Sequence, residues 1–183
     1  MAGLRKNTDQ ITVAVVTGVH TFDVPGFYAA FRSMSDVDFY PQSLEDFVAD
    51  RGSVRAEYDV VVFYNMHRPA PDEKTAAALE SLGESTQGIV VLHHGMLAFP
   101  EWPLWSEICG IEDREFGYHL NQTISVHVAD PSHPITAGLA DWEMLDETYT
   151  MSDASSECHI LLTTDHAKSM RTLAWSRQFR NAR

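Results

Sequence analysis

The sequence has few cysteines, few basic residues and no long apolar run, and each shortage excludes a class of protein. Its 183 residues hold only Cys109 and Cys158, without CxxC spacing, which excludes a disulfide framework and fits a reducing compartment. Lys and Arg total 13 against 26 Asp and Glu, so the net charge of -13 repels nucleic acid and anionic membranes. No stretch approaches the roughly 18 apolar residues of a membrane span, and the first residues lack the apolar segment of a leader. We therefore expect a cytoplasmic protein with no nucleic-acid or membrane partner.

The first half of the sequence alternates short apolar segments with helix-like stretches. One helix is predicted after Pro71 and is closed by Gly83, and a second runs from Pro103 to Gly110. Parallel neighbours need crossover connections, so this order predicts an α/β protein with a flavodoxin-like open, mainly parallel sheet and helices on both faces. The predicted strands are Ile11–Thr17, Val37–Tyr40, Tyr58–Tyr64 and Gly88–Leu92, the last of them buried on both faces.

The second half has few helical signals and should extend the edge of the same sheet. Its strand candidates are Thr123–Val128, Glu147–Met151, His159–Thr164 and Thr172–Ser176. No composition shift marks a boundary, so we expect one domain over residues 1–183, with a flexible N-terminus over residues 1–10. The end of the chain, from Trp175 to Arg183, reads like a turn into a further strand. Either the sheet lacks that strand or another chain supplies it, and an unpaired edge favours a homo-oligomer.

Four of the nine histidines follow predicted strands. His20 follows the first strand, His67 the third, and His93 and His94 the fourth. The carboxyl ends of parallel strands meet at one edge of a sheet, so these side chains should converge on one crevice. Each imidazole alone could simply satisfy a loop carbonyl, but the set predicts a polar pocket.

The segment from Gly88 to Gly95 reads as a strand followed by a sharp turn. In class I glutamine amidotransferases the corresponding strand ends in a Gly-x-Cys-x-Gly elbow whose cysteine is the nucleophile. Aligning the closing glycine on Gly95 places His93 in the position of that cysteine. An imidazole cannot replace the thiolate in that acyl transfer, so glutaminase activity is not expected.

The wider pattern resembles the ThuA-like (trehalose utilisation) family from about residue 11 to residue 180. The motifs that carry the resemblance are Thr17-Gly-Val-His20, the His93-His94 elbow, Trp102-Pro-Leu-Trp105-Ser-Glu-Ile-Cys-Gly110, Asp130-Pro-Ser-His133-Pro134-Ile-Thr-Ala-Gly138 and Asp146-Glu147-Thr-Tyr149. The resemblance implies an amidotransferase-like fold without the cysteine and a role in carbohydrate utilisation. The first loop departs from the more usual Gly-Gly-His of the family, and the family's final strand with a Gly-His pair does not occur in this sequence.

Other side chains could complete such a site. In a strand, the side chains of Glu147 and Tyr149 point to one face. This arrangement suits a general base with its orienting partner, or a pair of groups that bind polyol hydroxyls. The alternative is that Asp146 and Glu147 are an ordinary solvated pair of acids. Trp102 is expected beside a sugar pocket, and Trp105 in the core. Three of the five remaining histidines have other expected roles: His119 is a ligand candidate, His127 should face solvent by strand alternation, and His133 should fix its turn.

These patterns lead to two functional hypotheses. The first is an enzyme acting on a disaccharide or keto-sugar derivative through His93, His94 and Glu147, with substrate contacts from His20, His67, Trp102, His119, Asp146 and Tyr149. The second is a non-catalytic sugar-binding or regulatory module. A divalent metal such as zinc could draw ligands from His20, His93, His94, His119 and Glu147, but no compact ligand spacing supports it, so no metal ligand is assigned. The expected partner is a small-molecule carbohydrate.

Overall fold

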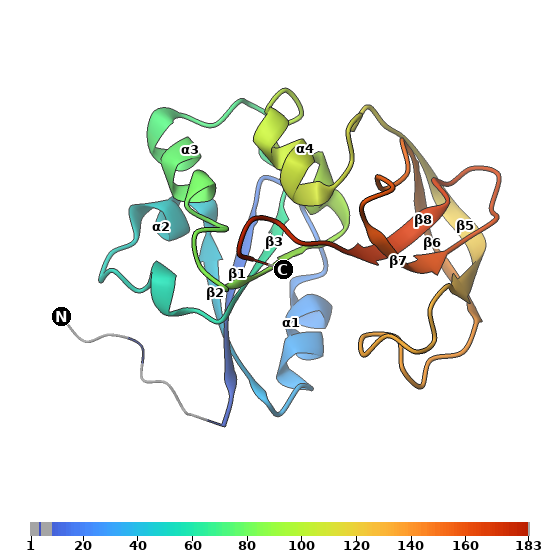
Figure 1. The fold of residues 1–183 in the computed structure, drawn as a ribbon, viewed down its shortest axis with the longest axis horizontal. Coiled ribbons are helices and arrows are strands. Elements are labelled where there is room, and N and C mark those ends of the chain that lie inside the picture. The colour runs from blue at the N-terminus through green and yellow to red at the C-terminus, as the bar shows by residue number, and fades with distance from the viewer. Residues whose placement is uncertain (1–3, 5–8, 183) are drawn as a thin grey trace. The chain divides into compact units, whose positions relative to one another are not determined.

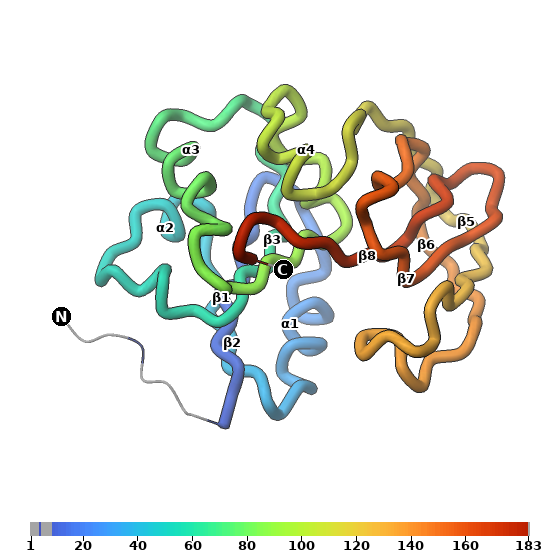
Figure 2. Tube along the Cα trace, viewed as in Figure 1, coloured from blue at the N-terminus to red at the C-terminus, as the bar shows by residue number. Residues whose placement is uncertain are grey.

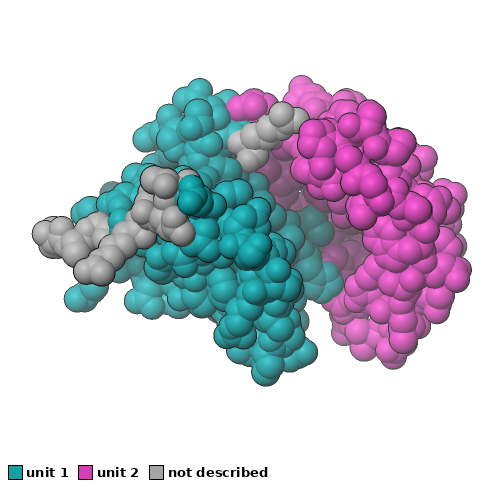
Figure 3. Space-filling view, turned by 90° about the horizontal axis from the view of Figure 1, so that it is seen from below, with its two compact units in different colours: residues 1–105, 179–183 teal, residues 106–178 magenta. Residues whose placement is uncertain are grey.

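The structure is a computed structural model that describes residue 4 and residues 9–182. The chain divides into two compact units, residues 1–105 with 179–183 (unit 1) and residues 106–178 (unit 2), as Figure 3 shows. Whether these units fold independently is a separate property, so the single domain over residues 1–183 stays a prediction. The expected flexible N-terminus, residues 1–10, lies for the most part outside the described residues.

Unit 1 is built on a four-stranded parallel sheet with the order β2-β1-β3-β4. Val13, Val15 and Val62 of its central strands pack against Phe31 in a hydrophobic core, which is why β-branched residues dominate there. All carboxyl ends of the strands lie at one edge of the sheet. The strands are β1 (Ile11–Gly18), β2 (Val37–Ser43), β3 (Val60–Asn65) and β4 (Gly88–Val91), which confirms the four predicted segments.

Helices cover both faces of this sheet. Helix α1 (Val24–Arg32) lies on one side, and α2 (Leu44–Ala49) and α3 (Glu73–Glu80) lie on the other (Figure 1). Each helix begins at a side chain that accepts a hydrogen bond from a backbone N–H of the first turn, namely Asp23, Ser43 and Asp72. The predicted helix after Pro103 is α4 (Pro103–Cys109). Within the described residues, no helix combines the length and the apolar character that crossing a membrane requires.

Strand β4 differs from its prediction. It pairs with β3 alone among the described strands and so lies at the edge of the parallel sheet. Its Val90 is 39% exposed, and its other residues are half-buried. The prediction that this segment is buried on both faces is therefore wrong, because an edge strand has one neighbour fewer to cover its side chains.

Unit 2 is built on a second, antiparallel sheet with the order β6-β5-β7-β8. The predicted strands are present, but the expectation that they extend a single mainly parallel sheet is wrong. Antiparallel neighbours need no crossover helix between them, and this half of the sequence offers no helical pattern between its strands. The protein is thus α/β with one parallel and one antiparallel sheet. The strands are β5 (Gly117–Val128), β6 (Trp142–Thr150), β7 (His159–Thr163) and β8 (Thr172–Ser176).

Residues 179–182, at the red end of the chain in Figure 2, belong to unit 1. Phe179 and Ala182 bridge to each other and close a tight turn, and the N–H of Asn181 donates to the carbonyl of Gly83 at 3.0 Å. Gly83 has φ +105°, and a Cβ there would lie 2.8 Å from Cε1 of Phe179. The glycine that ends the α3 region therefore also makes room for the docked C-terminal turn.

Candidate functional site

Histidines at the carboxyl ends of the parallel strands contact one another in unit 1. The ring of His94 lies against two others, with centroids 4.2 Å from His20 and 4.1 Å from Tyr64. His93 lies edge-on to His94 at 5.5 Å. His94 is only 1% exposed, and its Nε2 lies 3.2 Å from the carbonyl oxygen of Tyr64. Because a carbonyl oxygen only accepts, Nε2 carries the proton and this bond holds His94 in one tautomer.

His93 stands at the turn between β4 and the short 3-10 helix η2 (His93–Leu97). Its φ is +48°, in the left-handed region that strains a residue other than glycine. Gly95 packs so closely on β3 that an added Cβ would lie 2.7 Å from the carbonyl oxygen of Phe63. The strained turn and the close glycine are the features that a strand-turn-helix elbow requires. His93 itself is half-buried.

His67, after β3, is held from both sides of its ring. Nδ2 of Asn65 lies 3.1 Å from His67 Nδ1, and His67 Nε2 lies 3.4 Å from Oε1 of Glu45. An amide nitrogen only donates, so Nδ1 accepts and Nε2 donates to the carboxylate. The pKa of Glu45 is lowered, chiefly by a hydrogen bond from its own backbone and also by Ser43 and His67. A Cβ at Gly18 would lie 3.0 Å from Cε1 of His67, so this ring rests against the end of β1.

Asn65 and Glu45 were not among the site residues that the sequence predicted. Asn65 is the last residue of β3 and fully buried, whereas Glu45 follows β2 and is exposed. The rule that picked out the histidines, namely a polar side chain at a strand's carboxyl end, applies to both. The sequence prediction applied this rule to the imidazoles alone and therefore omitted both residues.

The two tryptophans near the elbow differ in burial. Trp105 is fully buried, its Nε1 donates to the carbonyl of Gly95 at 2.9 Å, and its ring lies edge-on to Phe63 at 5.1 Å. This confirms the prediction that Trp105 packs in the core beneath the elbow. Trp102 is half-buried, with its ring 5.8 Å from that of Phe99. Its place beside a sugar pocket stays a prediction.

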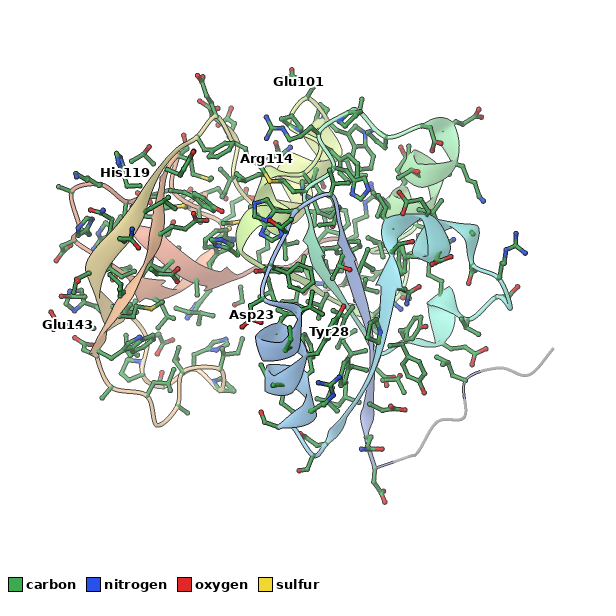
Figure 4. The ribbon with its side chains drawn as sticks, turned by 180° about the vertical axis from the view of Figure 1, so that it is seen from behind. Asp23, Tyr28, Glu101, Arg114, His119 and Glu143 are labelled. Carbon is green, nitrogen blue, oxygen red and sulfur yellow. The ribbon has the colours of Figure 1, made fainter. Side chains whose placement is uncertain are left out.

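In unit 2, Glu147 and Tyr149 share a face of β6. The hydroxyl of Tyr149 donates to Oε1 of Glu147 at 2.8 Å, as their spacing in a strand predicts. Asp146 instead accepts a hydrogen bond from the N–H of Glu147 at 2.8 Å and is exposed. His119, labelled in Figure 4, lies on β5 opposite Thr148 of β6.

The other histidines of unit 2 have carboxylate or backbone partners. His127 Nδ1 lies 2.9 Å from Oδ2 of Asp141, and this hydrogen bond is the largest cause that lowers the pKa of Asp141. His133 Nδ1 accepts from the N–H of Ile135 at 3.2 Å, so this ring fixes its own turn as predicted. These contacts give both imidazoles a structural role.

The carboxylate of Asp130 holds the turn that contains His133. The carboxylate accepts from the hydroxyl and the N–H of Ser132 and lies 2.8 Å from Nε2 of His159. The hydrogen bonds from Ser132, and then that from His159, lower the pKa of Asp130 to about 2. The rings of His133 and His159 lie 5.1 Å apart. The Asp130-Pro-Ser-His133 motif thus builds a compact hydrogen-bonded turn.

The structure brings together some of the predicted site residues and leaves one pairing open. His20, His93 and His94 contact one another in unit 1, and Glu147 contacts Tyr149 in unit 2. Whether Glu147 faces the histidines stays a prediction, since these residues belong to different units. In neither unit do three His, Cys, Asp or Glu side chains among the described residues cluster in a way that could hold a metal ion.

Neither cysteine lies on the elbow. Cys109 ends α4, and burial raises the pKa of its thiol to about 12, although Arg114 and Arg177 act in the opposite direction. Cys158 is 8% exposed, and its sulfur lies 3.8 Å from the carbonyl oxygen of Gly110. A thiol that stays protonated is a poor nucleophile, so we expect Cys109 to be unreactive in the folded protein.

Solved structures resemble this chain over most of its length. A protein described as ThuA-like from Parabacteroides merdae is 19% identical, with a TM-score of 0.67 over 94% of this chain and 77% of that one. A second from Bacteroides uniformis is 17% identical, with a TM-score of 0.66 over 92% and 78%. A glutamine amidotransferase from Thermotoga maritima is 11% identical, with a TM-score of 0.55 over 94% and 73%. At these identities the likeness shows an amidotransferase-like fold.

Sequence comparison identifies the family. No curated protein matches the chain significantly. The sequence model of the ThuA family, described as trehalose utilisation, matches residues 28–183. This match covers well over half of the sequence and includes the elbow, the Asp130 turn and the Glu147 strand. The chain therefore belongs to the ThuA (trehalose utilisation) family.

Proposed function

We propose that this protein acts on a carbohydrate, a disaccharide or a keto-sugar derivative, by acid-base chemistry at the strand ends of unit 1. Membership of a family described as trehalose utilisation supports a carbohydrate-related role. The observation that carries the chemical part is the contact of His94 with His20 and His93 at those ends. Imidazole titrates near neutral pH, which suits a group that both takes and returns a proton.

The two elbow histidines have different roles in this proposal. His93 is half-buried on a strained turn, so its ring can reach a ligand and move the proton. His94 is almost fully buried and bonded to the carbonyl of Tyr64, so it positions the rings of His20 and His93. For a keto-sugar, the base takes a proton from the hydroxyl-bearing carbon beside the carbonyl while the carbonyl oxygen gains a proton, which gives an enediol. The base then returns its proton to the former carbonyl carbon, and the neighbouring hydroxyl loses its proton and becomes the new carbonyl. Such an isomerisation balances without a further reactant.

Each unit on its own carries residues to which the proposal gives a role. Glu147, oriented by the hydroxyl of Tyr149, is the proposed second acid-base group. Substrate contacts are assigned to His20, His67, Trp102, His119, Asp146 and Tyr149. Carboxylates, imidazoles and aromatic rings are the groups that hold sugar hydroxyls and pack on C–H faces. No metal or other cofactor is assigned a step.

Glutamine hydrolysis is excluded from the proposal. The proposed alignment on Gly95 puts His93 in the position of the amidotransferase cysteine, and the buried thiol of Cys109 has its pKa raised to about 12. The same substitution motivates the alternative, a sugar-binding or regulatory module that retains a pocket without catalysis. The two hypotheses predict the same ligand and differ in whether product forms.

Product analysis of a panel of disaccharides and their keto derivatives tests the proposal. His93→Gln and Glu147→Gln should each lower turnover at least about tenfold. His127→Gln and Glu143→Gln are matched controls, because His127 pairs with Asp141 and Glu143 lies exposed near the start of β6 (Figure 4). Wild-type turnover in both site variants would refute the catalytic assignment. Saturable sugar binding by calorimetry without any product would establish the binding module instead.

We also expect a cytoplasmic protein whose partners are small carbohydrates and, through its sheet edges, a second copy of itself. Strands β6 and β8 are the outer strands of the antiparallel sheet among the described residues. An unpaired strand edge favours association. Sedimentation at micromolar concentration checks this, and a stable monomer would count against it.

A further inference from the structure

A cavity of about 270 Å³ in unit 1 lies outside the candidate site. It is formed by the second half of β2, helix α2, the loop after it, and the 3-10 helix η1 (Arg55–Glu57) with the residue that follows. Its volume is below the roughly 300–1,000 Å³ usual for cofactors and drug-sized ligands, so its occupant is small. The lining residues are Tyr40, Pro41, Gln42, Asp46, Phe47, Asp50, Arg51, Val54, Arg55 and Tyr58.

Two tyrosines and a glutamine form the part of the cavity beside β2. The rings of Tyr40 and Tyr58 lie 5.7 Å apart and are inclined by 57°. Nε2 of Gln42 donates to the hydroxyl oxygen of Tyr58 at 3.3 Å, which leaves the Tyr58 O–H to donate to a ligand. The hydroxyl of Tyr40 donates to Asp38 at 2.7 Å, so its oxygen can accept. This part of the cavity therefore offers aromatic faces together with a donor and an acceptor.

Side-chain contacts and hydrogen bonds order the part of the cavity formed by α2 and the loop after it. The guanidinium of Arg55 lies 5.7 Å from the ring centroid of Phe47 and donates to the carbonyls of Phe47 and Val48 at the end of α2. Oδ1 of Asp50 accepts from the N–H groups of Val54 and Arg55, both at 2.9 Å. A preformed wall lowers the entropy cost of binding.

The backbone of this wall is also unusual. Asp50 and Ser53, neither of them glycine, have φ of +45° and +54°, and Gly52 between them has φ +101°. The two non-glycine residues store strain, whereas Gly52 adopts its φ without steric cost, and such strain clusters at ligand-binding loops. The hydrogen bonds of the Asp50 side chain hold this conformation.

The charges and the ring geometry select the class of ligand. Arg51 and Arg55 are balanced by Asp46 and Asp50 within the lining, and Asp38 adds a carboxylate beside Tyr40. An anion gains little here, in a chain with net charge -13. The tilted tyrosines form no slot between parallel faces for a flat nucleobase. A puckered ring with C–H faces and hydroxyls fits both the aromatic faces and the mixed donors and acceptors.

We propose that this cavity is a binding site for one neutral, pyranose-sized sugar ring, separate from the histidine site. None of the histidines of the candidate site lines it. The proposal does not depend on the proposed chemistry, because it rests on the lining of this cavity alone. In a protein that handles a disaccharide, such a site would hold a single sugar ring away from the elbow.

Nuclear magnetic resonance on the ¹⁵N-labelled full chain tests this site, with glucose and trehalose as probes and adenosine as the control ligand. Glucose should shift the side-chain amide of Gln42 saturably, and adenosine should not. Tyr58→Phe and Gln42→Leu should each raise the Kd for glucose about fivefold, since each removes one hydrogen-bonding group. In both variants the Kd is read from the backbone amides of the cavity lining, because Gln42→Leu lacks the side-chain amide. Tyr28→Phe, a matched hydroxyl deletion on α1 (Figure 4), should leave the Kd unchanged.

Two results would overturn the proposal. One is the absence of a saturable shift at Gln42 in the wild-type protein. The other is a Kd that neither Tyr58→Phe nor Gln42→Leu changes, with folding of each variant checked by its Tm. Shifts confined to His20, His93 and His94 would place the sugar at the histidine site alone, which would refute this cavity and leave the proposed function intact.

Discussion

The imidazole of His94 lies against that of His20, with ring centroids 4.2 Å apart and planes inclined by 31°. The two residues differ in burial. His94 is 1% exposed and bonded to the carbonyl of Tyr64, whereas His20 is exposed. The buried ring thus forms the base on which the accessible ring rests. Substitutions at the two positions should separate stability from ligand contact.

His94→Ala should lower the free energy of unfolding by on the order of 2 kcal/mol, because it leaves a cavity beside Tyr64 and removes a buried hydrogen bond. His20→Ala should change it by less than about 0.5 kcal/mol, as expected of an exposed side chain. Urea unfolding measures both. Equal losses in the two variants would contradict the division of roles between them.

Gly95→Ala should be more destabilising than Gly138→Ala. A Cβ at Gly95 would meet the carbonyl oxygen of Phe63 at 2.7 Å, so the elbow would have to move off β3. At Gly138, φ is +84° and nothing lies within 4 Å, so only the backbone strain is felt. We expect losses of about 3 and about 1 kcal/mol in urea unfolding. A Gly95→Ala variant as stable as Gly138→Ala would show that the elbow adapts easily.

The sequence predicted the strands and the elbow because their signals are local. Apolar β-branched runs mark β1 and β3, and Gly83, Pro103 and Gly95 mark helix boundaries and the turn. The arrangement of the second half could not be predicted in the same way. Strands with no helices between them can either extend an existing sheet or pair among themselves. Only contacts between residues distant in sequence decide between these outcomes.

The same distinction applies to the sites. The bond between Tyr149 and Glu147 follows from a spacing of two in one strand. The contact of His67 with Glu45 joins residues from two different strand ends, and the cavity beside Tyr58 gathers residues from β2, α2 and η1. No local pattern encodes such convergence. A sequence reading therefore finds the residues of a strand or turn more readily than those of a cavity.

Cys109 should resist thiol reagents in the folded protein. Burial raises the pKa of its thiol to about 12, so almost no thiolate exists near neutral pH. Ellman's reagent should react with Cys109 at a rate limited by unfolding, and rapidly in urea. The Cys158→Ser variant leaves Cys109 as the one thiol, so the reaction is followed at that site alone. Fast reaction of the native Cys158→Ser protein would contradict this and would reopen the question of a thiol nucleophile.

The carboxylate of Asp130 should make stability depend on pH in a defined acidic range. Its pKa is lowered from 3.8 to about 2, first by the hydrogen bonds from Ser132 and then by His159. A depressed folded-state pKa contributes stability above the unfolded-state value, and this contribution is lost as the pH falls from about 3.8 to about 2. Asp130→Asn should therefore be less stable than the wild type at pH 5 in urea, with the difference shrinking through that range.

Ser132→Ala provides the matched test of the cause. It removes the side-chain hydrogen bond at 2.6 Å and keeps the backbone bond at 2.9 Å, so the pKa of Asp130 should rise toward its ordinary value. A carboxyl titration followed by nuclear magnetic resonance measures that midpoint directly. His159→Gln should raise the midpoint less, since His159 is a smaller cause than Ser132. If His159→Gln raised it more, the charge of the imidazole rather than the Ser132 turn would control the acid response of this motif.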